Sequence, residues 1–221
     1  MNGRPLAALR ATTTALRTTA SALLLAALPG CAPAQVAPQP VHADVARLKR
    51  GLDSLADAHR GTVGYSVSNL DTGEHLERRG DSTFSTASLI KVPILVTVYD
   101  LVAQKKLSLD DPISMLAIDQ VQGSGTLQFM HVPATITVHD AAWLMSTISD
   151  NTATNLLLDR IIIRRVWDKM ESLGLMHTKV HSKTFLRVSS FAYDSSVKYG
   201  LGVTTPNEMA KLSRCSRRGR P

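Results

Sequence analysis

Two short motifs carry the side chains that covalent catalysis requires. Ser88 and Lys91 form the pattern S-x-x-K, which on a helix places the hydroxyl and the ammonium on one face, about a turn apart. A buried lysine can lose its proton and act as a base, which turns a weakly nucleophilic serine into an acylating group. A second motif, Ser149-Asp150-Asn151, groups a hydroxyl, a carboxylate and an amide. The first motif predicts nucleophilic chemistry at Ser88, whereas the second taken alone could equally be a turn that caps a helix.

The context of Ser88 distinguishes it from a second S-x-x-K pattern at Ser195 and Lys198. A long apolar segment follows Ser88, whereas Ser, Tyr and Gly residues surround the second pattern. Ser88 is therefore expected at the N-terminus of a core helix, where backbone N–H groups and the helix dipole stabilise a developing anion. Pro93 lacks a backbone N–H, which predicts a local irregularity beside the nucleophile.

Hydrophobic periodicity places the elements that would position these motifs. Apolar residues three or four apart predict a helix that starts near Val45 and ends by Gly61. Alternating apolar residues from Val63 to Val67, followed by a turn at 71–73, predict a β-hairpin whose second strand covers 74–79. The folded part of the chain is thus expected to open with a helix and a hairpin.

The middle of the chain is predicted to be mostly helical. The segment 88–106 is too long for a typical strand and ends in two lysines, which the dipole at a helix C-terminus favours. Thr137 and Asp140 form the outline of a capping box before an apolar stretch that reaches Ile148. Further helices are expected before Gly174 and from Pro206.

Length and composition favour one domain, which we place at residues 42–212. The chain has 221 residues, of which 44% are hydrophobic, 19% charged and 5% aromatic. Its formal charge of +7 comes from the two ends, because residues 32–210 contain 17 basic and 18 acidic side chains. A nearly neutral domain with few aromatic residues gives no support for nucleic-acid binding.

The first 41 residues read as an export signal and a tether. Arginines precede a short apolar stretch, which predicts a signal peptide at 1–30. The sequence from Leu28 to Cys31 resembles a bacterial lipobox, so Cys31 is the predicted lipidation site; an ordinary signal peptide cut nearby is the alternative. Pro- and Ala-rich residues 31–41 suit a tether. We expect an exported protein of the periplasm or cell envelope, whose only membrane contact is the lipid anchor.

The combination of the two motifs resembles the class A β-lactamases, which are penicillin-recognising serine hydrolases. The similarity covers residues 62–212 and includes the run from Ser149 to Leu157. It implies an α/β fold of the α+β type: an antiparallel sheet lobe flanked by helices, an all-helical lobe, and a site between them. It also implies a small β-lactam substrate, no metal or organic cofactor, and a monomer.

The resemblance further implies a role for each motif residue. Ser88 would be the acylated nucleophile, and Lys91 would accept its proton. Ser149 would relay a proton to the departing lactam nitrogen, and Asp150 would hold its own loop by internal hydrogen bonds. Asn151 would bind the amide of the substrate's side chain.

Two features depart from the family pattern. Class A enzymes carry a glutamate in an ExxLN stretch that activates water for deacylation, whereas residues 183–199 contain no glutamate and one acid, Asp194. The family's KTG motif is absent up to Pro221, and residues 213–221 form a basic tail without an apolar period. We therefore expect a persistent acyl-enzyme, and a C-terminally truncated chain with an incomplete sheet, low stability and negligible lactamase activity.

Other candidate sites have less support. His177 and His181 lie four apart without further evident metal ligands, which favours loop histidines over a zinc site. Gly123 and Gly125 flank a serine without the Lys of a phosphate-binding loop, which predicts a turn or a loop at the rim of a cleft. Three functions stay open: a serine β-lactamase, a penicillin-binding peptidase or esterase of the same fold, and an inactive lipoprotein remnant.

Overall fold

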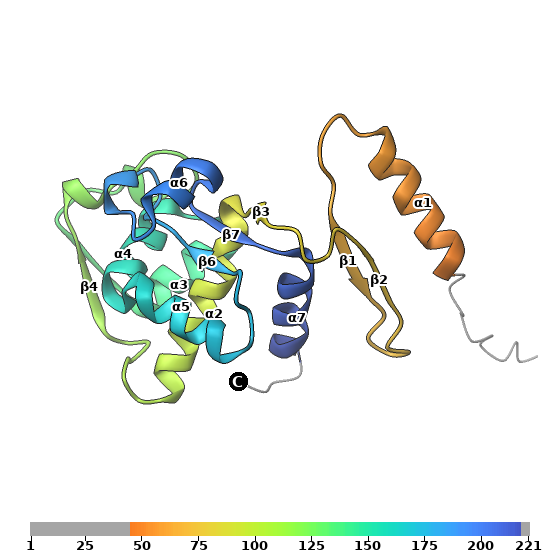
Figure 1. Ribbon diagram of the computed structural model, residues 1–221. Coiled ribbons are helices and arrows are strands. Elements are labelled where there is room, and N and C mark those ends of the chain that lie inside the picture. Colours follow the sequence, from red (N-terminus) through yellow and green to blue (C-terminus); the bar gives the residue numbers. More distant parts are fainter. Residues whose placement is uncertain (1–44, 218–221) are drawn as a thin grey trace, which may run out of the picture. The chain divides into compact units, whose positions relative to one another are not determined.

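The computed structural model describes the backbone of residues 45–217 and the side chains of residues 45–214 (Figure 1). The predicted signal peptide at 1–30, the tether at 31–41 with Cys31, and the end of the basic tail lie outside the described residues. No helix in the described part is long and apolar enough to cross a membrane.

Helices and short strands alternate along the described chain. The α-helices are α1 (Val45–Ala58), α2 (Lys91–Ala103), α3 (Val138–Thr147), α4 (Asn151–Ile161), α5 (Ile163–Ser172), α6 (Tyr193–Tyr199) and α7 (Pro206–Arg217). The strands are β1 (Tyr65–Ser68), β2 (His75–Arg78), β3 (Phe84–Ser85), β4 (Pro112–Met115), β5 (Ala134–Thr137), β6 (Lys179–Val180) and β7 (Gly202–Thr204). Short 3-10 helices are η1 (Ala87–Ile90), η2 (Ala117–Asp119), η3 (Leu127–Phe129) and η4 (Arg187–Ser189).

The predicted elements are confirmed, with two differences at helix ends. The capping box before α3 is formed, because Thr137 Oγ1 accepts from the Asp140 amide and Asp140 Oδ2 accepts from the Thr137 amide, each at 3.0 Å. The segment predicted as one helix over 88–106 is the 3-10 turn η1 followed by α2, which ends at Ala103. The break precedes Pro93, as its missing N–H predicts. α7 continues to Arg217, so the predicted domain boundary at 212 falls inside a helix.

The strands form three small antiparallel sheets. β1 pairs with β2, with Tyr65 opposite Arg78, and β4 pairs with β5. In the third sheet β7 lies between β3 and β6, with Phe84 opposite Thr204. The mixed α/β class predicted from the sequence is confirmed. β7 also pairs with β3, the strand that leads directly into η1.

The main hydrophobic core lies among α2, α3, α4 and α5, which Figure 1 shows grouped together. α2 buries Ile94, Val98 and Leu101 in this core. α4 is enclosed on all sides over its first two turns, since every residue from 151 to 158 is buried. A helix that is surrounded in this way belongs to the interior, so the start of α4 is held by packing as well as by its cap.

α7 connects the hairpin to this core. Met209 and Leu212 are buried in the core cluster, whereas Asn207 Nδ2 donates to Glu77 Oε2 at 2.6 Å and to Asp81 Oδ1 at 2.9 Å. The hairpin therefore contacts α7. The apolar face predicted for α1 is open, because the Leu55 side chain is 74% exposed.

Asp150 ties the start of α4 to a loop that precedes it by more than twenty residues. Its Oδ1 caps α4 by accepting from the Ala153 amide at 2.9 Å. Its Oδ2 accepts from the amides of Thr126 and Leu127 at 2.7 and 2.9 Å. Gly125 makes this approach possible, because a Cβ at that position would lie 2.2 Å from Asp150 Cγ.

Replacing Gly125 by Ala should therefore destabilise the fold. Gly125 has a φ of +108°, a backbone conformation that is strained for alanine, and the added Cβ would also collide with Asp150. Gly73→Ala is the matched control, because Gly73 has a φ of +78° with nothing within 4 Å of the added Cβ. In urea unfolding we expect Gly73→Ala to cost about 1–2 kcal/mol, and Gly125→Ala to cost at least about 2 kcal/mol more. Equal losses for the two variants would contradict the close contact with Asp150.

Candidate active site

Ser88 lies in the first turn of η1, on a backbone that is held under strain. The preceding residue, Ala87, has a φ of +42°, a conformation that side chains with a Cβ rarely adopt. Strand β3 leads into this turn, and the Thr86 amide donates to the Gly202 carbonyl of β7 at 3.1 Å. The sheet therefore fixes the approach of the chain, and Ser88 is exposed. Strain of this kind is concentrated at functional sites.

Lys91 joins the two sequence motifs. It begins α2, and only 5% of the residue is exposed. Its Nζ donates to the Ser149 carbonyl at 2.6 Å, to Ser149 Oγ at 2.8 Å and to Asn151 Oδ1 at 2.9 Å. An ammonium has three N–H donors, and these three acceptors use all of them.

Burial lowers the pKa of the Lys91 ammonium below its ordinary value of 10.5, and the nearby Asp150 carboxylate partly opposes this shift. The cause is the loss of hydration, which penalises the charged form of a lysine. A larger fraction of Lys91 is therefore neutral near physiological pH than for a lysine in water. The site thus holds a base in contact with the Ser149 hydroxyl and one helical turn after Ser88 in the sequence.

Ser149 and Asp150 form the turn between α3 and α4. Ser149 has a φ of +60°, the second strained residue at this site. The Asp150 amide donates to the Leu144 carbonyl at 3.2 Å, which anchors the turn on α3. This conformation turns both the carbonyl and the hydroxyl of Ser149 toward Lys91.

Asn151 is buried, and each end of its amide has a protein partner. Its Oδ1 accepts from Lys91, and its Nδ2 donates to the Gln122 carbonyl at 3.1 Å. Its backbone amide donates to the Ser124 carbonyl at 3.0 Å. The loop at 122–125 therefore lies directly beside the motif, and it is a loop, as its glycines predicted.

The structure brings three of the five predicted active-site residues into one hydrogen-bonded cluster: Lys91, Ser149 and Asn151. Asp150 lies between the last two in sequence, and its carboxylate bonds to the amides of Thr126, Leu127 and Ala153. Ser88 is placed one turn before Lys91, and no hydrogen bond among the described residues joins its hydroxyl to Nζ. Catalytic hydrogen bonds are often long without substrate and shorten when it binds. The second S-x-x-K pattern lies on α6, where Lys198 Nζ sits 4.9 Å from the centre of the Tyr199 ring.

Sequence reasoning missed two residues near this cluster, Asn155 and Phe185. Asn155 Oδ1 accepts from the Thr184 amide at 2.7 Å, and its Nδ2 donates to the Thr184 carbonyl at 3.1 Å. This pair holds the stretch in which the family's glutamate is expected against α4. Within that stretch Val188 is 93% exposed, and Asp194 is exposed in the first turn of α6. No periodicity or spacing in the sequence signals a contact between residues 155 and 184.

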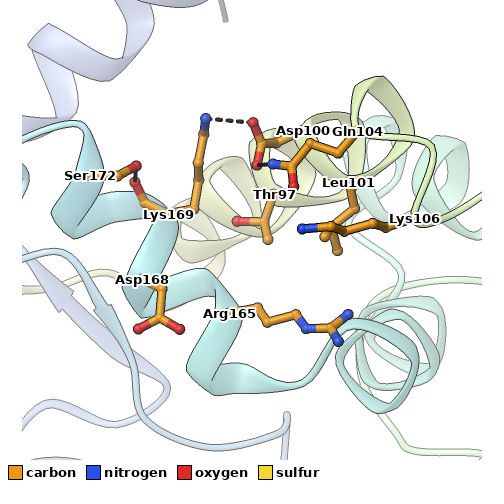
Figure 2. A pocket seen from close by; sticks show the side chains of 9 residues that line it. All are labelled: Thr97, Asp100, Leu101, Gln104, Lys106, Arg165, Asp168, Lys169 and Ser172. Carbon is orange, nitrogen blue, oxygen red and sulfur yellow. Dashed lines mark hydrogen bonds and ion pairs between the residues drawn. The ribbon is translucent and has the colours of Figure 1, made fainter.

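Other polar clusters of the described region lie apart from these motifs. Figure 2 shows a pocket between α2 and α5 in which the Asp100 carboxylate lies between Lys169 and Gln104, with contacts of 2.6 Å to each. His181 is buried, and its Nδ1 contacts the Gly200 carbonyl at 3.2 Å, whereas His177 is exposed. Among the described residues, no group of three or more His, Cys, Asp or Glu side chains could hold a metal ion.

Comparisons with known proteins agree with this geometry. β-Lactamase ROB-1 of Haemophilus influenzae is 31% identical over 150 residues, which are 63% of this chain and 48% of ROB-1. β-Lactamase AER-1 of Aeromonas hydrophila is 30% identical over 132 residues, which are 59% of this chain and 43% of AER-1. The chain thus spans about half the length of the curated relatives that it matches.

Solved structures give the same result. A β-lactamase from Sphaerobacter thermophilus superposes with a TM-score of 0.67 at 31% identity, over 77% of this chain and 61% of its own. PBP-A superposes with a TM-score of 0.68 at 28% identity, over 78% of this chain and 62% of its own. The sequence profile of the beta-lactamase enzyme family matches residues 47–215. The class A resemblance is therefore confirmed, and the chain belongs to the beta-lactamase enzyme family.

Proposed function

We propose that this chain is a serine hydrolase that β-lactams acylate at Ser88. The observation that carries the proposal is the position of Lys91, whose buried Nζ binds Ser149 and Asn151 one helical turn after Ser88. A base, a second hydroxyl and an amide are thus gathered beside an exposed serine. Their chemistry fits the opening of a strained cyclic amide without a metal ion or an organic cofactor.

In the proposed acylation, neutral Lys91 accepts the proton of the Ser88 hydroxyl while Oγ attacks the lactam carbonyl carbon. A bond forms between Ser88 Oγ and that carbon, and the lactam C–N bond breaks. The proton reaches the departing nitrogen through the Ser149 hydroxyl, which already contacts Lys91 at 2.8 Å. The first amides of a helix have no acceptor within it, so we assign the Ser88 N–H to the stabilisation of the oxyanion.

The second half-reaction needs an activated water, and here the chain differs from a typical class A enzyme. Residues 183–190 contain no carboxylate, and Asn155 holds only the backbone of Thr184. Without a general base, hydrolysis of the acyl-enzyme should be slow. This favours a penicillin-binding protein as the second candidate function. The similar solved structures include a PBP-A mutant described as an acyl-enzyme complex with penicillin G, 28% identical with a TM-score of 0.68.

For the location of the protein we propose export and a lipid anchor at Cys31, on the basis of the apolar stretch and lipobox-like residues before the tether. A single acyl chain binds membranes only marginally, so the anchor is expected to need more than one chain.

Mass spectrometry after mixing with benzylpenicillin tests the acylation. We expect an adduct with the mass of the intact penicillin, and a burst of penicillin consumption followed by turnover at least about 100-fold slower, because the base is missing. Ser88→Ala should form no adduct. Ser195→Ala, in the second S-x-x-K pattern, is the matched control and should react like the parent. An adduct on Ser88→Ala, or none on the parent, would contradict the proposal, and turnover as fast as the burst would contradict slow deacylation.

Replacing Cys31 by Ser tests the anchor. In cells that process lipoproteins, the parent chain should partition with membranes, and the Cys31→Ser variant should appear in the soluble envelope fraction. The parent should also gain mass from metabolically supplied, labelled fatty acid. If the variant fractionates with membranes as strongly as the parent, Cys31 is not the anchor.

A further inference from the structure

Phe185 occupies a backbone position that does not suit a large side chain. The Leu186 amide donates to the Lys183 carbonyl at 3.3 Å, which closes a tight turn with Phe185 at its third position. Phe185 has a φ of +58°, and turns of this kind favour Gly or Asn there because a Cβ is strained at positive φ. The chain therefore keeps an aromatic residue at a cost in stability. An outlier of this kind supports a functional hypothesis.

The turn that carries Phe185 is fixed from inside the protein. Asn155 holds both the amide and the carbonyl of Thr184, whose side chain is buried. Lys183 forms an ion pair with Asp159, and its amide donates to Ser189 Oγ at 3.1 Å. The backbone on the N-terminal side of Phe185 is therefore restrained, although 69% of the Phe185 residue is exposed.

The ring of Phe185 lies beside the site cluster. A Cβ built on Gly123 would be 2.8 Å from Asn151 Nδ2 and 3.1 Å from Phe185 Cε2. Because both atoms lie so close to the same point beside Gly123, the Phe185 ring and the Asn151 amide are neighbours. The same Asn151 amide contacts Lys91 through its oxygen. An exposed aromatic face thus borders the amide that faces the nucleophile's base.

We propose that Phe185 is a specificity-determining residue of the proposed site, which favours β-lactams whose acyl side chain carries an aromatic or other bulky apolar group. The inference rests on the proposed function. Asn151 is the hydrogen-bonding group for the side-chain amide of such a substrate, and the Phe185 ring is the apolar surface next to it. Aromatic groups gain from burial and from edge or offset contacts with such a ring.

Two small probes test the recognition without any lactam chemistry. N-phenylacetylglycine contains the aromatic acyl group and its amide, and N-acetylglycine lacks the ring. In NMR titrations of the full chain we expect the first probe to bind at least about fivefold more tightly than the second. In Phe185→Ala the ratio of the two dissociation constants should fall to about one. Phe129→Ala is the matched control, because Phe129 is 81% exposed at the end of η3 and should leave the ratio unchanged.

Phe185→Gly separates recognition from a structural role. Relief of the positive φ should raise the melting temperature of this variant, while its preference for the aromatic probe disappears. A structural role would instead lower the melting temperature and weaken both probes alike. Equal affinities of the parent for the two probes, or an unchanged ratio in Phe185→Ala, would overturn the inference.

The acylation rates of benzylpenicillin and 6-aminopenicillanic acid, measured in parallel, keep the two proposals distinguishable. Failure of both lactams to acylate Ser88 contradicts the proposed function, and the probe titrations still decide the role of Phe185. If both lactams acylate, the parent should prefer benzylpenicillin, and Phe185→Ala should lose that preference whereas Phe129→Ala should keep it. Acylation with no preference in the parent overturns the inference alone.

Discussion

The enclosure of one lysine governs the arrangement of the site. A buried ammonium without partners is costly, and Lys91 avoids that cost by donating to two oxygens of Ser149 and to Asn151 Oδ1 at the start of α4. Those oxygens are available only because Ser149 adopts a positive φ and Asp150 caps α4. The hydrogen bonds of Lys91 therefore link three features: the position of α2, the shape of the turn and the start of α4.

Glycines and residues with positive φ allow the surrounding loops to pack closely against this site. Gly125 lets the loop at 122–127 approach Asp150, and Gly123 leaves room for both Asn151 and Phe185. Ala87, Ser149 and Phe185 all have positive φ, and all three lie at the site or along its border. Backbone strain persists only where the surrounding structure supports it, and here the buried α4 and the β3–β7 pairing supply that support.

Local patterns in the sequence were sufficient for most of the α-helices and for the β1–β2 hairpin, but not for strands β3 to β7. The apolar period of 45–55, the Thr137 capping box and Pro93 are short-range features, and each produced the expected helix, cap or irregularity. The spacing of Ser88 and Lys91 likewise follows from helical geometry.

Long-range contacts could not be predicted from the sequence. The bond between Asn155 and Thr184 joins residues 29 positions apart, and its signal is absent from composition and periodicity. The packing of α7 on the hairpin and the open face of α1 depend on which surfaces meet, and periodicity says only that a face is apolar. Phe185 was missed because its backbone angle follows from the turn's tertiary anchors, and propensity would have placed Gly or Asn there.

The protonation of Lys91 is the most direct test of this account. A pH titration of the Nζ resonance in protein labelled with ¹⁵N-lysine, assigned with Lys91→Arg, measures its pKa without requiring any substrate. Because burial disfavours the charged form, Lys91 should lose its proton at a pH below its ordinary value of 10.5. A midpoint at or above 10.5 would mean that the hydrogen bonds and Asp150 keep Lys91 an ammonium, and it would contradict its role as the base that activates Ser88.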